Sequence, residues 1–115
     1  MSIGIDKILE EFGAVVDWRE NPVITQANIL DAIFIRNNPD RLQFTIINLS
    51  GSNIFIRPSQ AALTGTGIVL VANGGNFSVN VKDDGPLPII EWHVIGLLDN
   101  LDIYVLEIIG ISSLT

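Results

Sequence analysis

The chain has 115 residues, which is enough for one domain with a hydrophobic core and too few for two ordinary domains. Thirteen acidic residues against six Lys and Arg give a formal net charge of −7. This charge argues against sequence-independent binding to nucleic acid, because such binding needs several basic side chains to neutralise phosphates. Cysteine is absent, so disulfide bonds and thiolate metal sites are excluded.

Hydrophobic residues make up 48% of the chain and charged residues only 17%, below the usual share of about a quarter. The chain therefore has more apolar surface than a small domain on its own needs. The apolar runs are too short to span a bilayer. The N-terminus lacks the basic region of a signal peptide. We expect a soluble protein that is not secreted and has no membrane partner.

The first segment predicts an amphipathic helix over residues 3–12, which Gly13 ends. A helix of about ten residues is marginal in isolation. We therefore expect it to dock on its own domain or on a neighbouring subunit. The apolar residues at helical spacing are Ile5, Ile8, Leu9 and Phe12.

Residues 14–24 predict a short extended piece with a turn at 20–22. This interpretation places Trp18 outside the β domain, as an aromatic anchor at an interface. Residues 1–24 together are expected to form a docking or oligomerisation arm.

From Thr25 onward the pattern is β throughout, with β-branched and aromatic runs between Gly, Pro, Asn and Asp turns. Short polar turns join several strands in pairs, and we interpret these pairs as hairpins; residues 37–58 are the clearest example. The expected strands are 29–36, 41–49, 54–56, 68–71, 77–81, 89–95 and 101–109, with loops at 59–67 and 82–88.

Seven to eight short strands without intervening helices predict an all-β domain over residues 25–115. The expected architecture is an antiparallel β-sandwich, either a jelly roll or an Ig-like fold, with a barrel as the alternative. The strand order is left open.

Several strands carry apolar residues on both faces, as at Ile46-Ile47 and Val105-Leu106. In a two-sheet sandwich the outer face is normally wet. We therefore expect a homo-oligomer, a dimer or trimer, or permanent attachment to a larger surface. Ile47 is the strand residue expected at a subunit contact.

The sequence pattern predicts no catalytic, cofactor-binding or metal-binding residue. Glu91 and His93 share a strand face and form the strongest candidate for acid–base catalysis, but no nucleophile accompanies them. Acidic residues at 83–84, 99 and 102 lack the spacing of a calcium loop. Trp92 shares a strand face with apolar neighbours and is expected in the core.

The run NNPDRLQFTIINLSGSNIFIRP at 37–58 resembles a segment of small structural proteins of tailed bacteriophages. The resemblance continues through TGIVLVANGGNFSVNV and PIIEWHVIGLLDNLDIYVLEI and covers about residues 25–110. Residues 1–24 and the loop KDDGPLP depart from it.

This resemblance implies a non-enzymatic virion protein that coats or cements the shell. The major capsid protein, or another virion protein, would be its partner. We expect a capsid decoration protein on the outer surface of the head, assembled in the host cytoplasm. The alternative is a tail or fibre module that binds host-surface glycan through loops 59–67 and 82–88, and an enzyme using Glu91 and His93 is a more distant one.

Overall fold

The computed structural model describes residues 16–110. In this range the chain is almost entirely β, and no helix is long and apolar enough to cross a membrane. The elements are β1 (Val16–Arg19), β2 (Gln26–Ala27), β3 (Ala32–Ile35), β4 (Arg41–Asn48), β5 (Ile54–Pro58), β6 (Ile68–Leu70), β7 (Asn76–Asn80), α2 (Val81–Asp84), β8 (Trp92–Gly96) and β9 (Leu101–Gly110).

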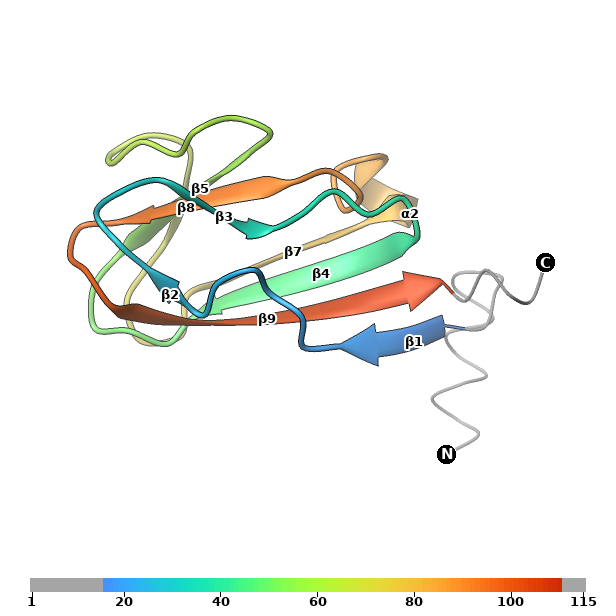
Figure 1. The fold of residues 1–115 in the computed structure, drawn as a ribbon, viewed down its shortest axis with the longest axis horizontal. Coiled ribbons are helices and arrows are strands. Elements are labelled where there is room, and N and C mark those ends of the chain that lie inside the picture. Colours follow the sequence, from blue (N-terminus) through green and yellow to red (C-terminus); the bar gives the residue numbers. More distant parts are fainter. Residues whose placement is uncertain (1–15, 111–115) are drawn as a thin grey trace.

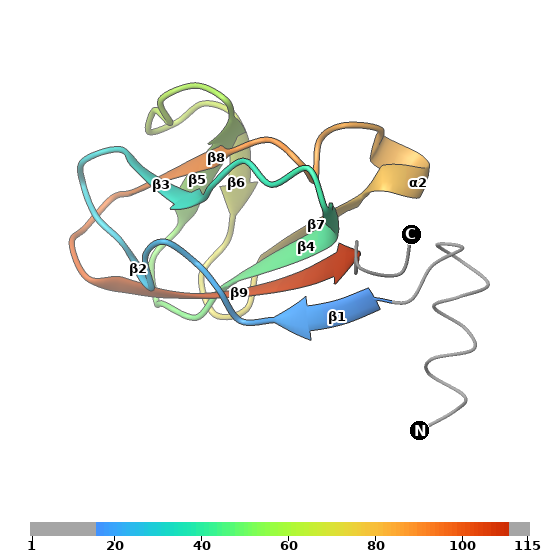
Figure 2. The ribbon, with the colours of Figure 1, turned by 45° about the vertical axis from the view of Figure 1, so that its right-hand side comes forward.

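The strands form two antiparallel sheets that pack face to face (Figures 1 and 2). One sheet has the order β1-β9-β4-β7, with β2 pairing β9 beside β1, and the other has the order β3-β8-β5-β6. From β2 to β9 every connection crosses from one sheet to the other, except that β5 leads to its neighbour β6 within one sheet, and the resulting strand order is that of a jelly roll. The all-β sandwich is confirmed, and the strand order selects the jelly roll over the Ig-like fold.

The expected hairpin at residues 37–58 is wrong. β4 pairs β7 and β9 in one sheet, whereas β5 pairs β6 and β8 in the other, so the turn at 50–53 crosses between sheets. The turns at 71–75 and 97–100 are also crossings, since β6 and β8 lie in one sheet and β7 and β9 in the other. Turn residues reverse the chain equally well in both cases, so they do not identify the strand's partner.

Four crossings gather at one end of the sandwich, which we call the loop end. The strand registers place them there: Ala27 pairs Leu101, Ile47 pairs Asn76, and Ile54 pairs both Leu70 and Gly96. The loop end comprises residues 28–31, 49–53, 71–75 and 97–100.

Asn48 is fully buried at the loop end and joins two of these crossings. Its side-chain amide donates to the carbonyls of Ser52, Leu70 and Val71 at 2.8, 2.9 and 3.2 Å. Its side-chain oxygen accepts from the backbone N and Oγ of Ser50. Asn48 thereby satisfies backbone groups that have no strand partner where the chain leaves each sheet.

The core lies between the sheets and is centred on aromatic rings. Phe44 makes edge contacts with Phe34 and Trp92, at centroid distances of 6.0 and 5.4 Å. Trp92 is 1% exposed, and its Nε1 donates to the Leu87 carbonyl at 2.9 Å. The prediction that Trp92 belongs to the core is confirmed.

Three local predictions need correction. The strand expected at 29–36 is confined to β3, because residues 28–31 belong to a crossing. The strand expected at 89–95 begins only at Trp92, since the Ile89 backbone bonds Pro86 and Asn38 instead of a strand. The loop expected at 82–88 contains the helical turn α2, which Asn80 caps by accepting from the Asp83 N–H at 2.9 Å.

Trp18 lies within a sheet and not outside the β domain. β1 pairs β9 antiparallel, with Trp18 opposite Ile108. Residues 16–19 are therefore part of the sheet, although they precede residue 24, where the arm was expected to end. The expected helix at 3–12, with Ile5, Ile8, Leu9 and Phe12, lies outside the described residues.

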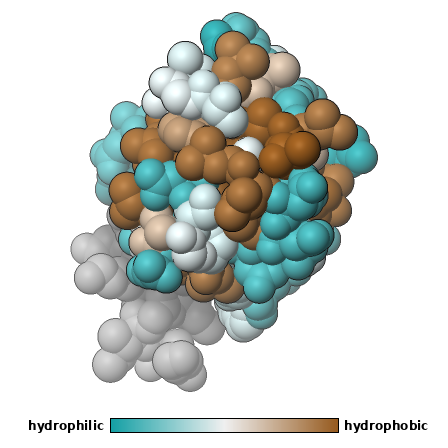
Figure 3. Space-filling view, turned by 90° about the vertical axis from the view of Figure 1, so that its left-hand side faces the viewer, coloured by the Kyte–Doolittle hydropathy of each residue, from teal (hydrophilic) through white to brown (hydrophobic). Residues whose placement is uncertain are grey.

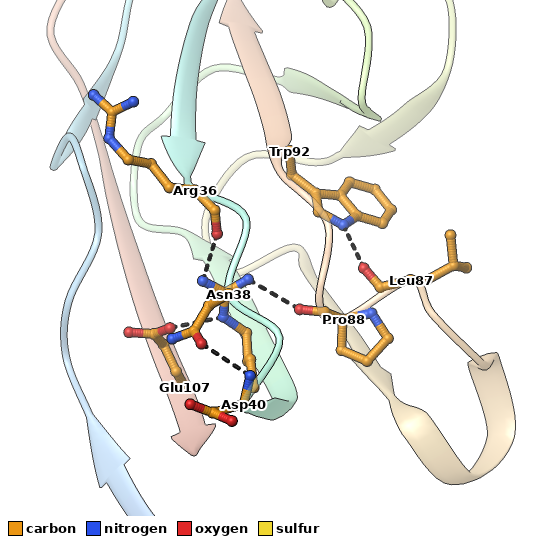
Figure 4. Close-up of polar contacts among 8 residues, drawn as sticks. Arg36, Asn38, Asp40, Leu87, Pro88, Trp92 and Glu107 are labelled. Atoms are coloured by element: carbon orange, nitrogen blue, oxygen red, sulfur yellow. Dashed lines mark hydrogen bonds and ion pairs between the residues drawn. The ribbon is translucent and has the colours of Figure 1, made fainter. Parts of the chain in front are cut away.

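Arg41 is buried at the end of the sandwich opposite the loop end. Figure 4 shows the groups around it that it binds, on Arg36, Pro88 and Glu107. Its Nε donates to Glu107 Oε1 at 2.7 Å, and the two side chains are only 3% and 2% exposed. Its other nitrogens donate to the carbonyls of Pro88 and Arg36. One guanidinium on β4 therefore binds β9, the connection that follows β3 and the connection that precedes β8.

Asn48→Ala should lower the free energy of unfolding by about 2–4 kcal/mol, because it leaves several buried polar groups without partners at about 1–3 kcal/mol each. Asn48→Asp should also destabilise the fold, since a carboxylate oxygen, which cannot donate a hydrogen bond, would replace the amide nitrogen that faces three carbonyls. Urea unfolding measures both, with exposed Asn37→Ala as the control. A cost for Asn48→Ala no larger than the control would contradict the assigned role.

Arg41→Met and Glu107→Leu should each cost about 3–5 kcal/mol, because each leaves the partner's charge buried without its counterion. The double variant should cost clearly less than the sum of the two. Additive costs in denaturant unfolding would argue against the coupling. Exposed Arg36→Met is the matched control and should change stability little.

Candidate interaction surfaces

The outer face of the β1-β9-β4-β7 sheet brings together two residues predicted at an interface, Trp18 and Ile47. Trp18 pairs Ile108 across β1 and β9, while Ile47 pairs Tyr104 across β4 and β9. Directly paired residues point to the same side of a sheet, and alternate residues of one strand share a face. Trp18, Ile108, Leu106, Tyr104 and Ile47 therefore lie on one face, which we call the outer stripe.

The outer stripe is apolar where an antiparallel sandwich normally meets water. Trp18 is 63% exposed, and the other four side chains are half-buried. On β4 and β7, beside the stripe, the sheet is polar without charge: the hydroxyls of Thr45 and Ser78 lie 2.9 Å apart, and Gln43 Nε2 reaches Ser78 Oγ at 3.5 Å. At the stripe itself, the Glu20 carboxylate accepts a hydrogen bond from the Tyr104 hydroxyl. This arrangement suits a protein contact with an apolar centre and a hydrogen-bonding margin.

The loop end is a second apolar surface, which the sequence did not predict. Figure 3 shows hydrophobic side chains gathered over this end of the molecule. The signal in the sequence was the pairs at 29–30 and 97–98, where apolar residues occupy turns and not strands. Six large side chains here are each more than half exposed: Ile29, Leu30, Leu49, Val71, Leu97 and Leu98.

Hydrogen bonds between the crossings hold the loop end in one shape. The Asn28 carbonyl accepts from Gly96 N at 2.8 Å, and its side-chain oxygen accepts from Asn100 N at 2.9 Å. Asn73 N donates to the Ser50 carbonyl at 2.8 Å, and Leu49 N donates to the Asp102 carbonyl. The apolar side chains thus stand on loops that are joined to one another and to the sheets by hydrogen bonds.

His93 lies between two carboxylates on the outer face of the other sheet. Its Nδ1 is 3.0 Å from Asp31 Oδ2, and its Nε2 is 2.9 Å from Glu91 Oε2. The predicted pairing of Glu91 with His93 is confirmed, and Asp31 is an additional partner. Arg57 is its cross-strand neighbour. Asp31 also accepts from Ala62 N at 2.6 Å, which attaches the 59–67 loop to this cluster.

The pKa of His93 is raised above its ordinary value of 6.5. Partial burial alone lowers this pKa, but the hydrogen bonds and negative charges of Asp31 and Glu91 together outweigh the burial. Both ring nitrogens are occupied by these carboxylates. The cluster therefore serves to hold the 59–67 loop and the 28–31 crossing to β8.

The remaining candidates are dispersed. Asp83 and Asp84 follow β7 at the end away from the loop end, whereas Asp99 and Asp102 lie at or beside the loop end. Within residues 16–110, no group of three His, Asp or Glu side chains is arranged so that it could hold a metal ion. An open cleft of about 320 Å³ lies beside Arg41 and Glu107, but both of these side chains are engaged in holding the fold.

No protein-family model matches the chain, and no curated protein matches it. The fold is similar to a solved structure described as "Bacillus endospore appendages form a novel family of disulfide-linked pili". The TM-score is 0.52 at 15% sequence identity, and the match covers 84% of this chain and 89% of the other. At this identity the likeness extends to the fold alone.

The His93 cluster predicts a pH-dependent contribution to stability. Because the folded-state pKa is raised, protonated His93 stabilises the fold fully below the unfolded pKa of about 6.5. This contribution is lost as the pH rises through the folded-state pKa. Urea unfolding at several pH values between about 5.5 and 8.5 should show the loss. The trend should be weaker in His93→Gln, and equal trends in both proteins would contradict the assignment.

Proposed function

We propose that the protein is a non-enzymatic structural protein of a bacteriophage virion, a decoration or cement protein on the outer surface of the head. Its work is to bind the major capsid protein, and the outer stripe is the surface that makes this contact. The observation that carries the proposal is the gathering of Trp18, Leu106, Ile108 and Ile47 on one face of the sheet. The resemblance of residues 25–110 to small phage structural proteins supports the choice of partner.

The jelly-roll fold suits this role, because it offers large sheet faces and a rigid loop surface for contact with other subunits. The description of the similar Bacillus structure refers to endospore appendages that form disulfide-linked pili, which are assemblies. Disulfide links are not available to this chain, since it has no cysteine. Subunits here would be held by non-covalent contacts, in a dimer or trimer and on the shell.

Trp18→Glu and Leu106→Glu should each weaken binding to capsid shells by about tenfold or more, because a carboxylate in an apolar contact is desolvated without a partner. Co-sedimentation of the purified protein with shells that lack it measures the dissociation constant. Val69→Glu is the matched control, since Val69 is an exposed strand residue of the other sheet. Unchanged binding by both stripe variants would reject the outer stripe as the contact.

Labelling the protein on purified phage particles tests its location independently. Label over the heads is expected. Label confined to tails, or absent from particles, would overturn the decoration role.

A further inference from the structure

The loop end is an exposed apolar surface separate from the outer stripe. Its six exposed apolar side chains come from four different crossings, and inter-loop hydrogen bonds fix their positions. Isolated exposed apolar residues are ordinary on a protein surface, but a contiguous set marks an interaction site. A surface already held in shape loses little conformational entropy on binding.

The charges around the loop end limit what it can bind. Asp31, Asp99 and Asp102 lie at or beside it, and residues 28–31, 48–53, 70–75 and 96–102 contain no Lys or Arg. Anionic ligands such as nucleic acid or an acidic headgroup would be repelled. The surface fits an apolar segment whose own charges point away from it.

Residues 1–15 contain such a segment. At helical spacing, Ile5, Ile8, Leu9 and Phe12 share one face, whereas Asp6, Lys7, Glu10 and Glu11 fall on the other. Docked through the apolar face, this segment would present its charges to water.

The place where residues 1–15 join the fold decides which copy they bind. Val16 pairs Gly110, at the far end of β9 from Leu101 and the loop end. The ten residues of β9 separate these points by about 30 Å. A helix over 3–12, as the sequence predicts, would be about 15 Å long and residues 13–15 would add about 10 Å, so such a helix would not reach the loop end of its own copy.

We propose that the loop end of one copy binds residues 1–15 of a second copy, through the apolar face formed by Ile5, Ile8, Leu9 and Phe12. The contact joins two different surfaces and is therefore head to tail. It closes into a ring if the rotation between copies allows, and otherwise continues as a linear chain.

Disulfide trapping tests this contact, because the natural chain has no cysteine and introduced ones react without background. Leu9→Cys protein mixed with Leu98→Cys protein should form a cross-linked pair of one copy each under mild oxidation, since a disulfide needs close approach of the two Cβ atoms. Val69→Cys, exposed on the outer face of the other sheet, replaces Leu98→Cys in the control mixture. Trapping no greater than in this control would overturn the proposal.

The double variant Leu9→Cys/Leu98→Cys identifies the copy. Covalent species of two or more chains are expected, and cross-linked single chains would show that the segment binds its own loop end and would overturn the proposal.

Sedimentation equilibrium of the full chain should show self-association that Leu9→Glu and Leu98→Glu each weaken by about tenfold or more. Val69→Glu should leave it unchanged. A natural chain that stays monomeric, or association insensitive to both variants, would overturn the proposal. These measurements use no capsid, so their failure is distinct from failure of the shell contact.

Discussion

The fold depends on satisfying backbone groups where the chain passes from one sheet to the other. A hairpin keeps its carbonyls in the ladder, but a crossing takes the chain out of the ladder while it is still beside the core. Asn48 meets this constraint, because its amide reaches carbonyls on both the β4–β5 and β6–β7 crossings. Arg41 has the corresponding role at the other end of the same strand. β4 therefore carries a buried polar side chain at each end and an apolar core side between them.

These two side chains also explain why the two ends of the sandwich differ. At the end with Arg41, a charge-assisted network binds the connections and polar groups face the cleft beside it. At the loop end, a neutral amide and backbone bonds hold the crossings, so the side chains of those loops are free to be apolar. The interior contacts thus leave one end polar and the other suited to association.

The sequence predicted the class of fold well, because alternation in segments such as 41–48 and 101–110 reports directly which side of a strand is buried. It also placed Trp92 in the core and Glu91 beside His93. It did not predict the pairing of strands, because Asn, Gly and Ser turns reverse the chain identically within a sheet and between sheets. Trp18 was assigned to a separate arm because β1 is only four residues long and its partner is about ninety residues away. The loop end was missed because the apolar pair at 29–30 was attributed to a strand and the pair at 97–98 was given no role. Asp31 was missed because its contact with His93 joins residues far apart in the sequence.

The pairing of Val16 with Gly110 has a practical consequence for presenting foreign sequences. Both ends of the described chain lie side by side at the end of the sandwich away from the loop end (Figure 1). A peptide or fluorescent domain fused after Thr115 would join the described fold through Gly110, at the end of the sandwich opposite the apolar crossings. Such a fusion is a route to displaying cargo on an assembly while the loop end stays available for contact.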